Sequence, residues 1–413
     1  MRTANAVVHL RVVCLCVVFT LALAHGAAFA TTYVVNPEGT GDFATIQAAV
    51  DSAGTGDVIL LADGTYTGPG NRDIVVPAVT FTIRSESWDA MVCIIDCQGS
   101  AREEHRGFHF TPGDAIPWLE DVAVINGYTT THGGGIWIEG VDAVLADVII
   151  ANCTAEGDDT RGGGLYVSDG ADVLISLCTI TGNSGGYGGG VSVWSAGGNF
   201  DGCLIGDNEV DGFQGLAGGV YATAGAYLEF SYCRIVSNTA PRAGGVRMFG
   251  NMSLVNCEIA RNDALYGHSG GVWLLGGTVS NCTIVENSAA SDAAGVYCFA
   301  GTGAVENSII AFNGPGFGVG ADEGQEPTLT CCDVYGNPDG NYDAVVGDQT
   351  GIDNNFSQDP EFCWFDGADY RLYDTSPCLA SVSPCGQLVG ALDQGCDSPV
   401  EESSWGKVKA LYR

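Results

Sequence analysis

Two short motifs that recur together every 24 to 31 residues limit the possible folds of this chain more than any other feature. One is a glycine run followed by a short alternating strand, as in GGVWL at 270–274, and the other ends in asparagine, as in CTIVEN at 282–287. A shared fixed period of this length is typical of solenoids. The glycine motif recurs at 133–138, 162–167, 188–193, 218–222, 244–248, 270–274 and 294–298. The asparagine motif recurs at 121–126, 147–152, 178–183, 203–208, 233–238, 257–262, 282–287, 308–313 and 331–337.

Aligning the repeats gives three apolar columns, which we predict to be the inward faces of short strands. A single coil cannot bury such a face, so neighbouring coils must stack at the sheet spacing of ~4.8 Å. The first column holds Val144, Ile175, Phe200, Phe230, Leu254, Val279, Val305 and Leu329. The second holds Ile149, Ile180, Ile205, Ile235, Ile259, Ile284, Ile310 and Val334. The third holds Ile136, Leu165, Val191, Val220, Val246, Val272 and Val296.

A column of asparagines closes each repeat and predicts a turn. Asparagine tolerates left-handed backbone geometry, and stacked side-chain amides can hydrogen-bond from coil to coil. A leucine-rich horseshoe is disfavoured, because its leucine spacing and helical half are missing, and a propeller blade needs a longer period. The column consists of Asn126, Asn152, Asn183, Asn208, Asn238, Asn262, Asn287, Asn313 and Asn337.

The repeated GGG[I/V]x[I/V] and C-x-I-x-x-N pattern resembles that of secreted bacterial β-helix proteins of the pectate-lyase-like superfamily. The resemblance covers about 32–396, and the GDFATIQAAVD and DGTYTG segments are similar to the start of pectin-methylesterase-like β-helices. It implies an all-β fold, a right-handed parallel β-helix solenoid with a short N-terminal capping helix. The helix is expected within 44–53, with Ile46, Ala49 and Val50 on one face.

The chain divides into five predicted segments. Residues 1–30 combine two arginines, an apolar run and an Ala-Phe-Ala end, which predicts a secretory signal peptide and an exported protein. No later segment is long and apolar enough to span a membrane. An N-terminal cap with the first coils (31–110), the regular coils (111–337) and a C-terminal cap (338–398) follow. The tail 399–413 carries Lys407, Lys409 and Arg413 and is either a frayed helix or a sorting-signal remnant.

The net charge limits the possible binding partners, and the cysteine content bears on the cellular compartment of the protein. The formal net charge is −34, so binding to a phosphate backbone is excluded as a function. Export permits disulfides, and Cys93 with Cys97, and some pairing among Cys363, Cys378, Cys385 and Cys396, are the expected bridges. One repeat column of cysteines is instead expected to hold buried thiols, because in-register neighbours lie too far apart to bond. It consists of Cys178, Cys203, Cys233, Cys257, Cys282 and Cys332.

The residue after the first inward aliphatic of each glycine-led strand should point outward. Five of these seven positions are aromatic. An exposed aromatic stripe on a parallel sheet suits the apolar faces of sugar rings and marks a binding surface. The other interpretation is that these rings stabilise one another between coils. The predicted carbohydrate-binding residues are Trp137, Tyr166, Tyr221, Trp273 and Tyr297.

Two long loops, 155–163 and 209–219, leave their coils at the same point and carry several carboxylates. Clustered carboxylates could hold Ca²⁺, which takes six to eight oxygen ligands. Solvated acidic loops are the alternative, since acids occur throughout this chain. The candidate ligands are Glu156, Asp158, Asp159, Asp207, Glu209 and Asp211.

Catalytic residues are not identified by the resemblance. Polygalacturonases of this fold carry Asn-Thr-Asp and Arg-Ile-Lys motifs, which are absent here. Arg161, Arg242 and Arg247 flank the glycine-led strands and are interpreted as ion-pair residues, while His132 has no matching partners. We therefore predict a secreted or cell-surface, non-catalytic module that binds polysaccharide along the aromatic stripe. The alternatives are a lyase or hydrolase with divergent catalytic residues, and a structural or adhesive surface protein. The oligomeric state is left open.

Overall fold

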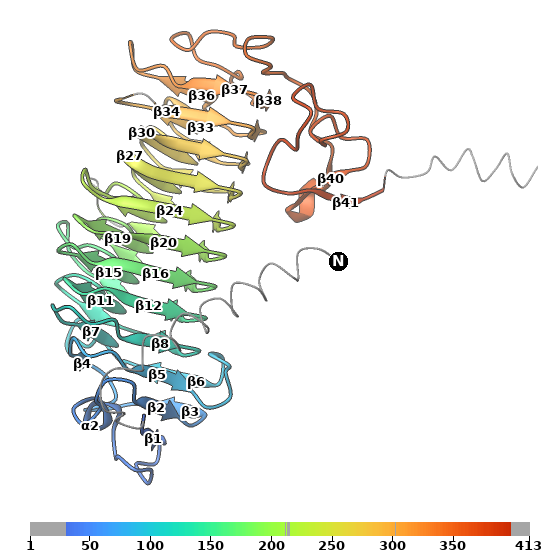
Figure 1. Ribbon diagram of the computed structural model, residues 1–413. Helices are drawn as coiled ribbons and strands as arrows, with labels where there is room; N and C mark the ends of the chain where they lie inside the picture. The colour runs from blue at the N-terminus through green and yellow to red at the C-terminus, as the bar shows by residue number, and fades with distance from the viewer. Residues whose placement is uncertain (1–29, 211, 213–214, 302, 398–413) are drawn as a thin grey trace, which may run out of the picture.

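The computed structural model describes residues 30–397 except 211, 213, 214 and 302, and it is a stack of parallel coils (Figure 1). Residues 1–29 of the predicted signal peptide lie outside the described residues, and so does the tail from residue 398 onward. The coils contribute strands to three parallel sheets of 20, 11 and 7 strands. The predicted all-β, right-handed parallel β-helix is confirmed. In the described part of the chain, no helix is long and apolar enough to cross a membrane.

The 20-stranded first sheet contains two rows of strands side by side. The row that begins each coil is formed by the glycine-led strands, called GG strands below, and in β27 and β30 both rows join into one long strand. The GG strands are β7 (Phe108–Phe110), β11 (Ile136–Glu139), β15 (Leu165–Ser168), β19 (Val191–Trp194), β23 (Val220–Ala222), β27 (Val246–Val255), β30 (Val272–Ser280), β33 (Ala293–Cys298) and β36 (Phe317–Ala321), with β4 (Ile74–Val76) before them. The second row is β1 (Thr32–Val35), β2 (Val58–Leu61), β5 (Thr82–Ser85), β8 (Trp118–Glu120), β12 (Ala143–Ala146), β16 (Asp172–Ser176), β20 (Gly197–Asp201), β24 (Tyr227–Ser231), β34 (Gly303–Glu306) and β37 (Thr328–Thr330).

The other two sheets complete each coil. The 11-stranded second sheet is formed by the asparagine motifs, and the 7-stranded third sheet has two residues per strand. The second sheet is β3 (Gly64–Tyr66), β6 (Cys93–Asp96), β9 (Ala123–Ile125), β13 (Ile149–Ala151), β17 (Thr179–Thr181), β21 (Leu204–Gly206), β25 (Arg234–Val236), β28 (Glu258–Ala260), β31 (Thr283–Val285), β35 (Ile309–Ala311) and β38 (Asp333–Tyr335). The third sheet is β10 (Tyr128–Thr129), β14 (Thr154–Ala155), β18 (Ser184–Gly185), β22 (Glu209–Val210), β26 (Thr239–Ala240), β29 (Asp263–Ala264) and β32 (Ser288–Ala289).

The N-terminal end of the stack is covered by α2 (Ile46–Val50), which lies within the predicted helical segment. Thr45 is its N-cap, and its hydroxyl accepts a hydrogen bond from the Ala48 backbone N–H, as a helix start requires. The buried side chains of α2 are those predicted, Ile46, Ala49 and Val50. The capping helix therefore shields the first coil from solvent.

Two predicted columns are off by one residue in the coil that contains β12 and β13. Leu145, not Val144, pairs with Ile175, and Ile150, not Ile149, pairs with Ile180. Leu145 and Ile150 are fully buried. The reason is that Cys153 takes the place of the ladder asparagine: its backbone N–H donates to Asn183 Oδ1 at 2.9 Å. An alignment on asparagine therefore shifts this repeat by one position.

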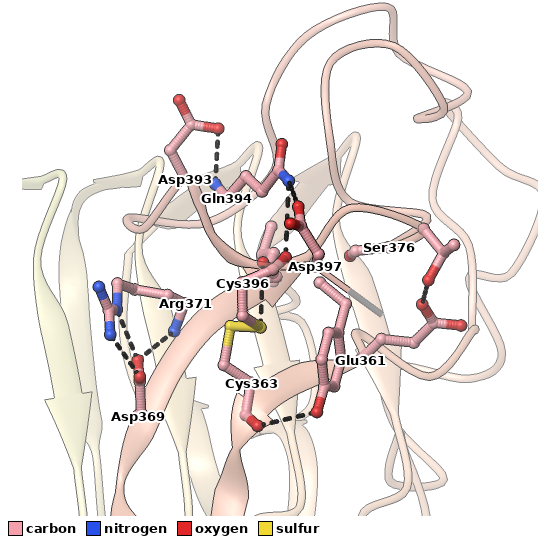
Figure 2. The surroundings of a disulfide bond; sticks show 12 residues. Glu361, Cys363, Asp369, Arg371, Ser376, Asp393, Gln394, Cys396 and Asp397 are labelled. Carbon is pink, nitrogen blue, oxygen red and sulfur yellow. Dashed lines mark hydrogen bonds and ion pairs between the residues drawn. A yellow bond between two sulfur atoms is a disulfide. The ribbon is translucent and has the colours of Figure 1, made fainter. Parts of the chain in front are cut away.

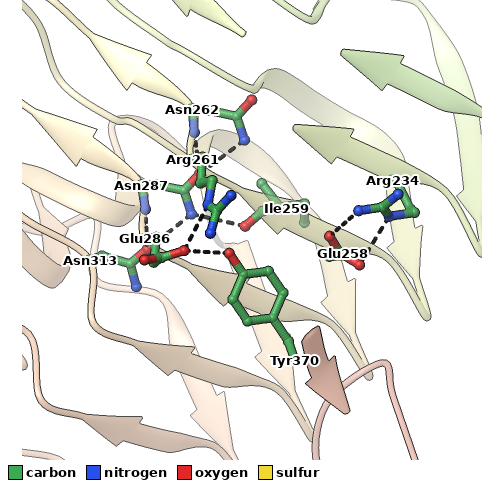
Figure 3. Close-up of polar contacts among 9 residues, drawn as sticks. All are labelled: Arg234, Glu258, Ile259, Arg261, Asn262, Glu286, Asn287, Asn313 and Tyr370. Carbon is green, nitrogen blue, oxygen red and sulfur yellow. Dashed lines mark hydrogen bonds and ion pairs between the residues drawn. The ribbon is translucent and has the colours of Figure 1, made fainter. Parts of the chain in front are cut away.

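The asparagines form a buried ladder along the second sheet edge, as Figure 3 shows for three of them. Asn262 Nδ2 donates to Asn287 Oδ1 at 2.9 Å and to the Ile235 carbonyl oxygen at 2.9 Å. The left-handed residue of the turn is the one before the ladder asparagine, such as Arg261 with φ +58°. Asn126 and Asn152 are exceptions that occupy the left-handed position themselves. The predicted amide stacking is thus present, while the predicted left-handed role belongs to the neighbouring residue.

The cysteine column consists of buried free thiols, as predicted. The predicted Cys93–Cys97 disulfide is wrong, because both cysteines are free and buried. They stand four residues apart at the two ends of an extended segment, which places their Cα atoms ~13 Å apart at strand spacing, beyond what a disulfide can bridge. The disulfides are Cys363–Cys396, within the predicted set, and Cys331–Cys385. Cys378 is free.

The segment after the last regular coil has two parts. Residues 341–356 lie on the last coil, through bridges of Tyr342 with Val319 and of Phe356 with Asp333. Residues 358–397, with β39 (Phe362–Trp364), η1 (Phe365–Gly367), β40 (Asp369–Tyr373) and β41 (Gln394–Cys396), run back beside the solenoid (Figures 1 and 2). They pack on apolar residues of the second sheet such as Val285 and Ala311. The segment predicted as a C-terminal cap therefore has one part on the end of the stack and one part beside it.

Asp333 is a fully buried carboxyl at this contact, and its pKa is raised to about 7 by desolvation. Its oxygens accept from the Gln358 backbone N–H at 3.0 Å and lie 3.2 Å from Cys378 Sγ. The unfolded chain loses this proton near its usual pKa of 3.8, so between about pH 4 and 7 the folded state binds more protons and stability falls as pH rises.

We expect the variant Asp333→Asn to remove this loss. Relative to the parent protein, its free energy of unfolding should rise by about 3 kcal/mol between about pH 5 and pH 8, because the amide stays neutral. Urea unfolding at several pH values measures the difference. A constant difference across this range would contradict the prediction.

Candidate functional site

The outer surface of the GG strands is the candidate site, and glycine makes it possible. A Cβ on Gly163 would lie 2.2 Å from the Ser184 carbonyl oxygen, so the glycine run lets consecutive coils approach closely. The residue before each run is thereby held over the strand. We call the two outward rows the GG-strand face. It comprises His109, Trp137, Tyr166, Ser192, Tyr221, Arg247, Trp273 and Tyr297 on the strands, and His132, Arg161, Tyr187, Arg242 and His268 before the glycines.

The predicted aromatic stripe is not exposed. Tyr166, Tyr221, Trp273 and Tyr297 are 5, 7, 3 and 5% exposed, and Trp137 is partly buried. Side chains from the preceding row cover them. The expectation of an open stripe is therefore wrong, because the rings form a packed second layer. The covering contacts include His132 to Tyr166 at 4.9 Å, Tyr187 to Tyr221 at 5.3 Å and His268 to Tyr297 at 5.5 Å between ring centroids.

The rings that reach solvent near this face lie one row further along the strands. Trp194 is 38% and Phe299 is 40% exposed. Both follow an outward position of a GG strand by two residues, so they belong to the same side of the sheet. The alternation of inward and outward side chains predicts them, if the row of outward positions on each GG strand is continued by two residues toward the C-terminus.

Besides Arg106, whose guanidinium lies 5.3 Å from the Trp137 ring centroid, two arginines of this face rest on aromatic rings. The Arg161 guanidinium lies 4.1 Å from the ring centroid of Trp194 and 5.9 Å from that of Tyr187. The Arg247 guanidinium lies 4.7 Å from Phe249, 4.9 Å from Trp273 and 5.3 Å from Tyr221.

Neither arginine forms a salt bridge within the described residues. Arg161 Nη1 instead lies 3.5 Å from His132 Nε2 and 3.4 Å from the Asp159 carbonyl oxygen. Burial lowers the pKa of Arg247. The sequence-based interpretation of Arg161 and Arg247 as ion-pair residues is therefore wrong.

The N-terminal part of the face carries two histidines whose pKa values are lowered. His109 stacks on Trp137 at 4.4 Å, and its Nε2 lies 2.8 Å from Glu139 Oε2. Burial lowers the pKa of His109 against the opposing effect of Glu139, and burial followed by the charge of Arg161 lowers the pKa of His132. Both imidazoles are therefore neutral at neutral pH and can accept a proton.

The C-terminal part of the face is more acidic. His268 Nδ1 lies 2.6 Å from Asp292 Oδ2, and this contact lowers the pKa of Asp292. The Tyr297 hydroxyl donates to Asp322. The charge on the face therefore changes from basic near β15 to mixed near β33.

Unsatisfied buried polar atoms concentrate on this face. Eight such side-chain atoms occur in the described residues, and five of them belong to it. A buried polar group without a partner costs free energy and needs an explanation. The fold therefore gives up stability here more than elsewhere. The five are His132 Nδ1, Arg161 Nε, Ser192 Oγ, Arg247 Nε and Trp273 Nε1.

The acidic loops lie on one side of the solenoid, as predicted, because β14 and β22 belong to the same sheet and are separated only by β18. Five of the candidate calcium ligands, Glu156, Asp158, Asp159, Asp207 and Glu209, are exposed. Within the described ranges, no three His, Cys, Asp or Glu residues come together in a way that could hold a metal ion. Asp211 lies outside those ranges, so calcium binding stays a prediction.

Together, the fold and the face define a right-handed parallel β-helix with an extended lateral surface. The family model described as "Right handed beta helix region" matches residues 119–240 and 213–357. This chain belongs to that family. No curated protein matches the sequence.

A solved structure supports the same fold. The chain is similar to a pectate lyase, Pel9A, with a TM-score of 0.52 and 15% identity over 90% of this chain and 98% of the other. A rhamnogalacturonan lyase matches with a TM-score of 0.48 and 13% identity over 91% and 98%. A pectin methylesterase from Aspergillus niger matches with a TM-score of 0.36 and 15% identity, over 81% of this chain and 92% of the other. At this identity the first likeness supports the fold alone.

Proposed function

We propose that this protein is an exported β-helix module that binds polysaccharide on the GG-strand face without cleaving it. The observation that carries the proposal is the combination, on one lateral face, of the exposed rings of Trp194 and Phe299 with two partly exposed arginines, Arg161 and Arg247, that form no salt bridge within the described residues. Sugars present apolar ring faces that stack on aromatics, and hydroxyl groups that accept hydrogen bonds from guanidinium N–H groups. The extended shape of the face fits a chain-like ligand.

The contact residues differ from those expected from the sequence. Trp194 and Phe299 offer accessible ring surface, Trp137 of the predicted set is partly buried, and the rings of Tyr166, Tyr221, Trp273 and Tyr297 are buried beneath the face. Pectate lyase and rhamnogalacturonan lyase, named in the structural comparisons, act on polysaccharides, which agrees with this ligand class. Export through the 1–30 leader, checked by the mass of the secreted protein, would place the module where polysaccharides occur.

A panel of neutral and acidic polysaccharides in affinity electrophoresis tests the proposal. The parent protein should be retarded by at least one of them, and Trp137→Ala/Trp194→Ala should reduce the affinity roughly tenfold, since stacked rings contribute about 0.5–1.5 kcal/mol each beyond their burial. Trp364→Ala is the matched control, because Trp364 is 66% exposed and lies on β39. Absence of binding to every polysaccharide would reject the proposal.

A lyase is the second candidate, favoured by one observation. His132 is a neutral base at neutral pH, and its Nε2 lies 3.5 Å from Arg161, which could hold a sugar carboxylate. The same panel decides between the two, since elimination would create a C4–C5 double bond with ultraviolet absorbance. Product formation that is lost in His132→Gln would establish the lyase and overturn the non-catalytic assignment.

A further inference from the structure

We propose that a groove between the solenoid and the segment 358–397 binds a small organic cation that carries a methylated ammonium group. The groove lies beside the second sheet and not on the GG-strand face, so this inference is independent of the proposed function. Its volume is about 480 Å³, within the usual range of small-molecule sites. Its lining includes four aromatic and two acidic side chains, which are Phe312, Phe362, Phe365, Tyr373, Asp359 and Glu361.

The aromatic walls come from two parts of the chain that meet only in the folded protein. Phe312 follows β35 of the solenoid, whereas Phe362 belongs to β39 and Phe365 to η1. The rings of Phe362 and Phe365 are nearly parallel, at 8° with centroids 6.2 Å apart, and Phe312 is inclined to Phe365 by 58° at 4.7 Å. Phe312, Phe365 and Tyr373 are partly exposed. Rings in several orientations therefore border the groove, and the negative faces of such rings attract a cation.

The asparagine ladder fixes the position of Phe312. This residue has a left-handed backbone, with φ +55°, and precedes the ladder residue Asn313, whose Nδ2 donates to Asn337 Oδ1 at 3.1 Å. The ring of Phe312 lies against Gly336, where a Cβ would come within 2.7 Å of its Cε1 atom. The glycine thus leaves the room that the ring occupies. A wall that is in place before the ligand arrives lowers the entropy cost of binding.

The two carboxylates of the groove have neutral hydrogen-bond donors as partners. Asp359 Oδ1 accepts from the Glu361 backbone N–H at 2.9 Å, and Glu361 Oε2 accepts from the Thr375 hydroxyl. Among the residues that the structure describes, neither acid forms an ion pair. Arg371 of β40 pairs instead with Asp369 at 2.6 Å, as Figure 2 shows. The negative charge at the groove is therefore available to a ligand.

This combination of rings and acids selects a weakly hydrated organic cation. Phenylalanine rings offer no ligand atoms to a metal ion, and the described ranges bring together no three His, Cys, Asp or Glu residues that could hold one. A methylated ammonium group packs its methyl groups against rings, while its charge is attracted by the ring faces and the carboxylates. The net charge of −34 also concentrates cations around the protein. A neutral ligand of the same shape would gain the apolar contacts alone.

Calorimetric titration of the purified full chain with choline and with tetramethylammonium tests the inference. The matched ligand control is the neutral alcohol in which a carbon atom replaces the nitrogen of choline, because it keeps the shape without the charge. We expect saturable binding of both cations and an affinity at least roughly tenfold lower for the neutral alcohol. Sodium chloride at the same ionic strength controls for general attraction between charges.

Variants locate the site. Phe365→Leu keeps an apolar side chain but removes a ring face, and Glu361→Gln removes a charge, so each should lower the choline affinity roughly fivefold. Trp364→Leu and Asp366→Asn are the matched controls, because these exposed neighbours do not line the groove, and both should leave the affinity unchanged. Thermal unfolding checks that each variant is folded.

Three results would overturn the inference. The first is equal affinity for choline and the neutral alcohol, or unchanged affinity in both Phe365→Leu and Glu361→Gln. The second is binding of a lysine-rich peptide without binding of either methylated cation, which would assign the groove to a protein partner. The third is the absence of saturable binding. None of them bears on polysaccharide binding, which the Trp137→Ala/Trp194→Ala variant tests separately.

Discussion

Replacing Gly189 by valine is expected to prevent normal stacking of the coils and lower the free energy of unfolding by more than about 3 kcal/mol. A Cβ at this position would lie 2.1 Å from the Glu209 carbonyl oxygen and 2.8 Å from its backbone nitrogen, both of which belong to the third sheet. Backbone atoms of a neighbouring coil cannot move aside as a side-chain end can. Urea unfolding followed by circular dichroism measures the loss.

Gly250→Ala provides the matched control. Gly250 lies in β27 of the first sheet, and a Cβ there would have no heavy atom within 4 Å. This variant should unfold within about 0.5 kcal/mol of the parent, as surface substitutions usually do. Equal stability of the two variants would show that the glycine run is not required for close approach of the coils.

The second large effect concerns the asparagine ladder. Asn238→Leu, a replacement of similar volume without polar atoms, should destabilise the protein by about 3 kcal/mol. Asn238 is fully buried, and its Nδ2 donates to the Ile205 carbonyl oxygen at 2.9 Å. Its Oδ1 accepts a hydrogen bond from the Asn208 backbone N–H at 3.1 Å. In the leucine variant this N–H group would stay buried without an acceptor.

The control for the ladder is Asn199→Leu, because Asn199 is exposed on β20 and has no such role. Unfolding by urea at neutral pH compares the two leucine variants directly. If Asn238→Leu were as stable as Asn199→Leu, the amide ladder would not be a source of stability, and the apolar columns would hold the coils together alone.

Most of the fold was predictable because a solenoid repeats one local solution. Each coil must place aliphatic side chains above those of the next, so the columns appear in the sequence at a fixed period. The error occurred at the coil of Leu145 and Ile150, where Cys153 replaces the ladder asparagine. The thiol accepts a hydrogen bond from the Gly127 backbone N–H, so a different residue type fills the same place. Periodicity cannot reveal such an exchange.

The candidate site was predictable in position but not in character. Alternation places Trp137, Trp273 and Arg247 on the outer face, where they lie. Alternation does not say what covers a side chain. His268, five residues before Trp273, folds over that ring at 4.9 Å, and it took the structure to show that Arg247 has rings and not a carboxylate beside it.

The sequence by itself determined the stack of coils, the helix at its start and the face that the glycine runs create. These follow from short-range periodicity, since each is specified by residues within one or two repeats. The tertiary structure alone decided which rings are open, which arginines lack an acid and where 358–397 packs. Those outcomes depend on side chains from neighbouring coils and from distant segments meeting in space, as Glu286 and Tyr370 do across 84 positions of the chain.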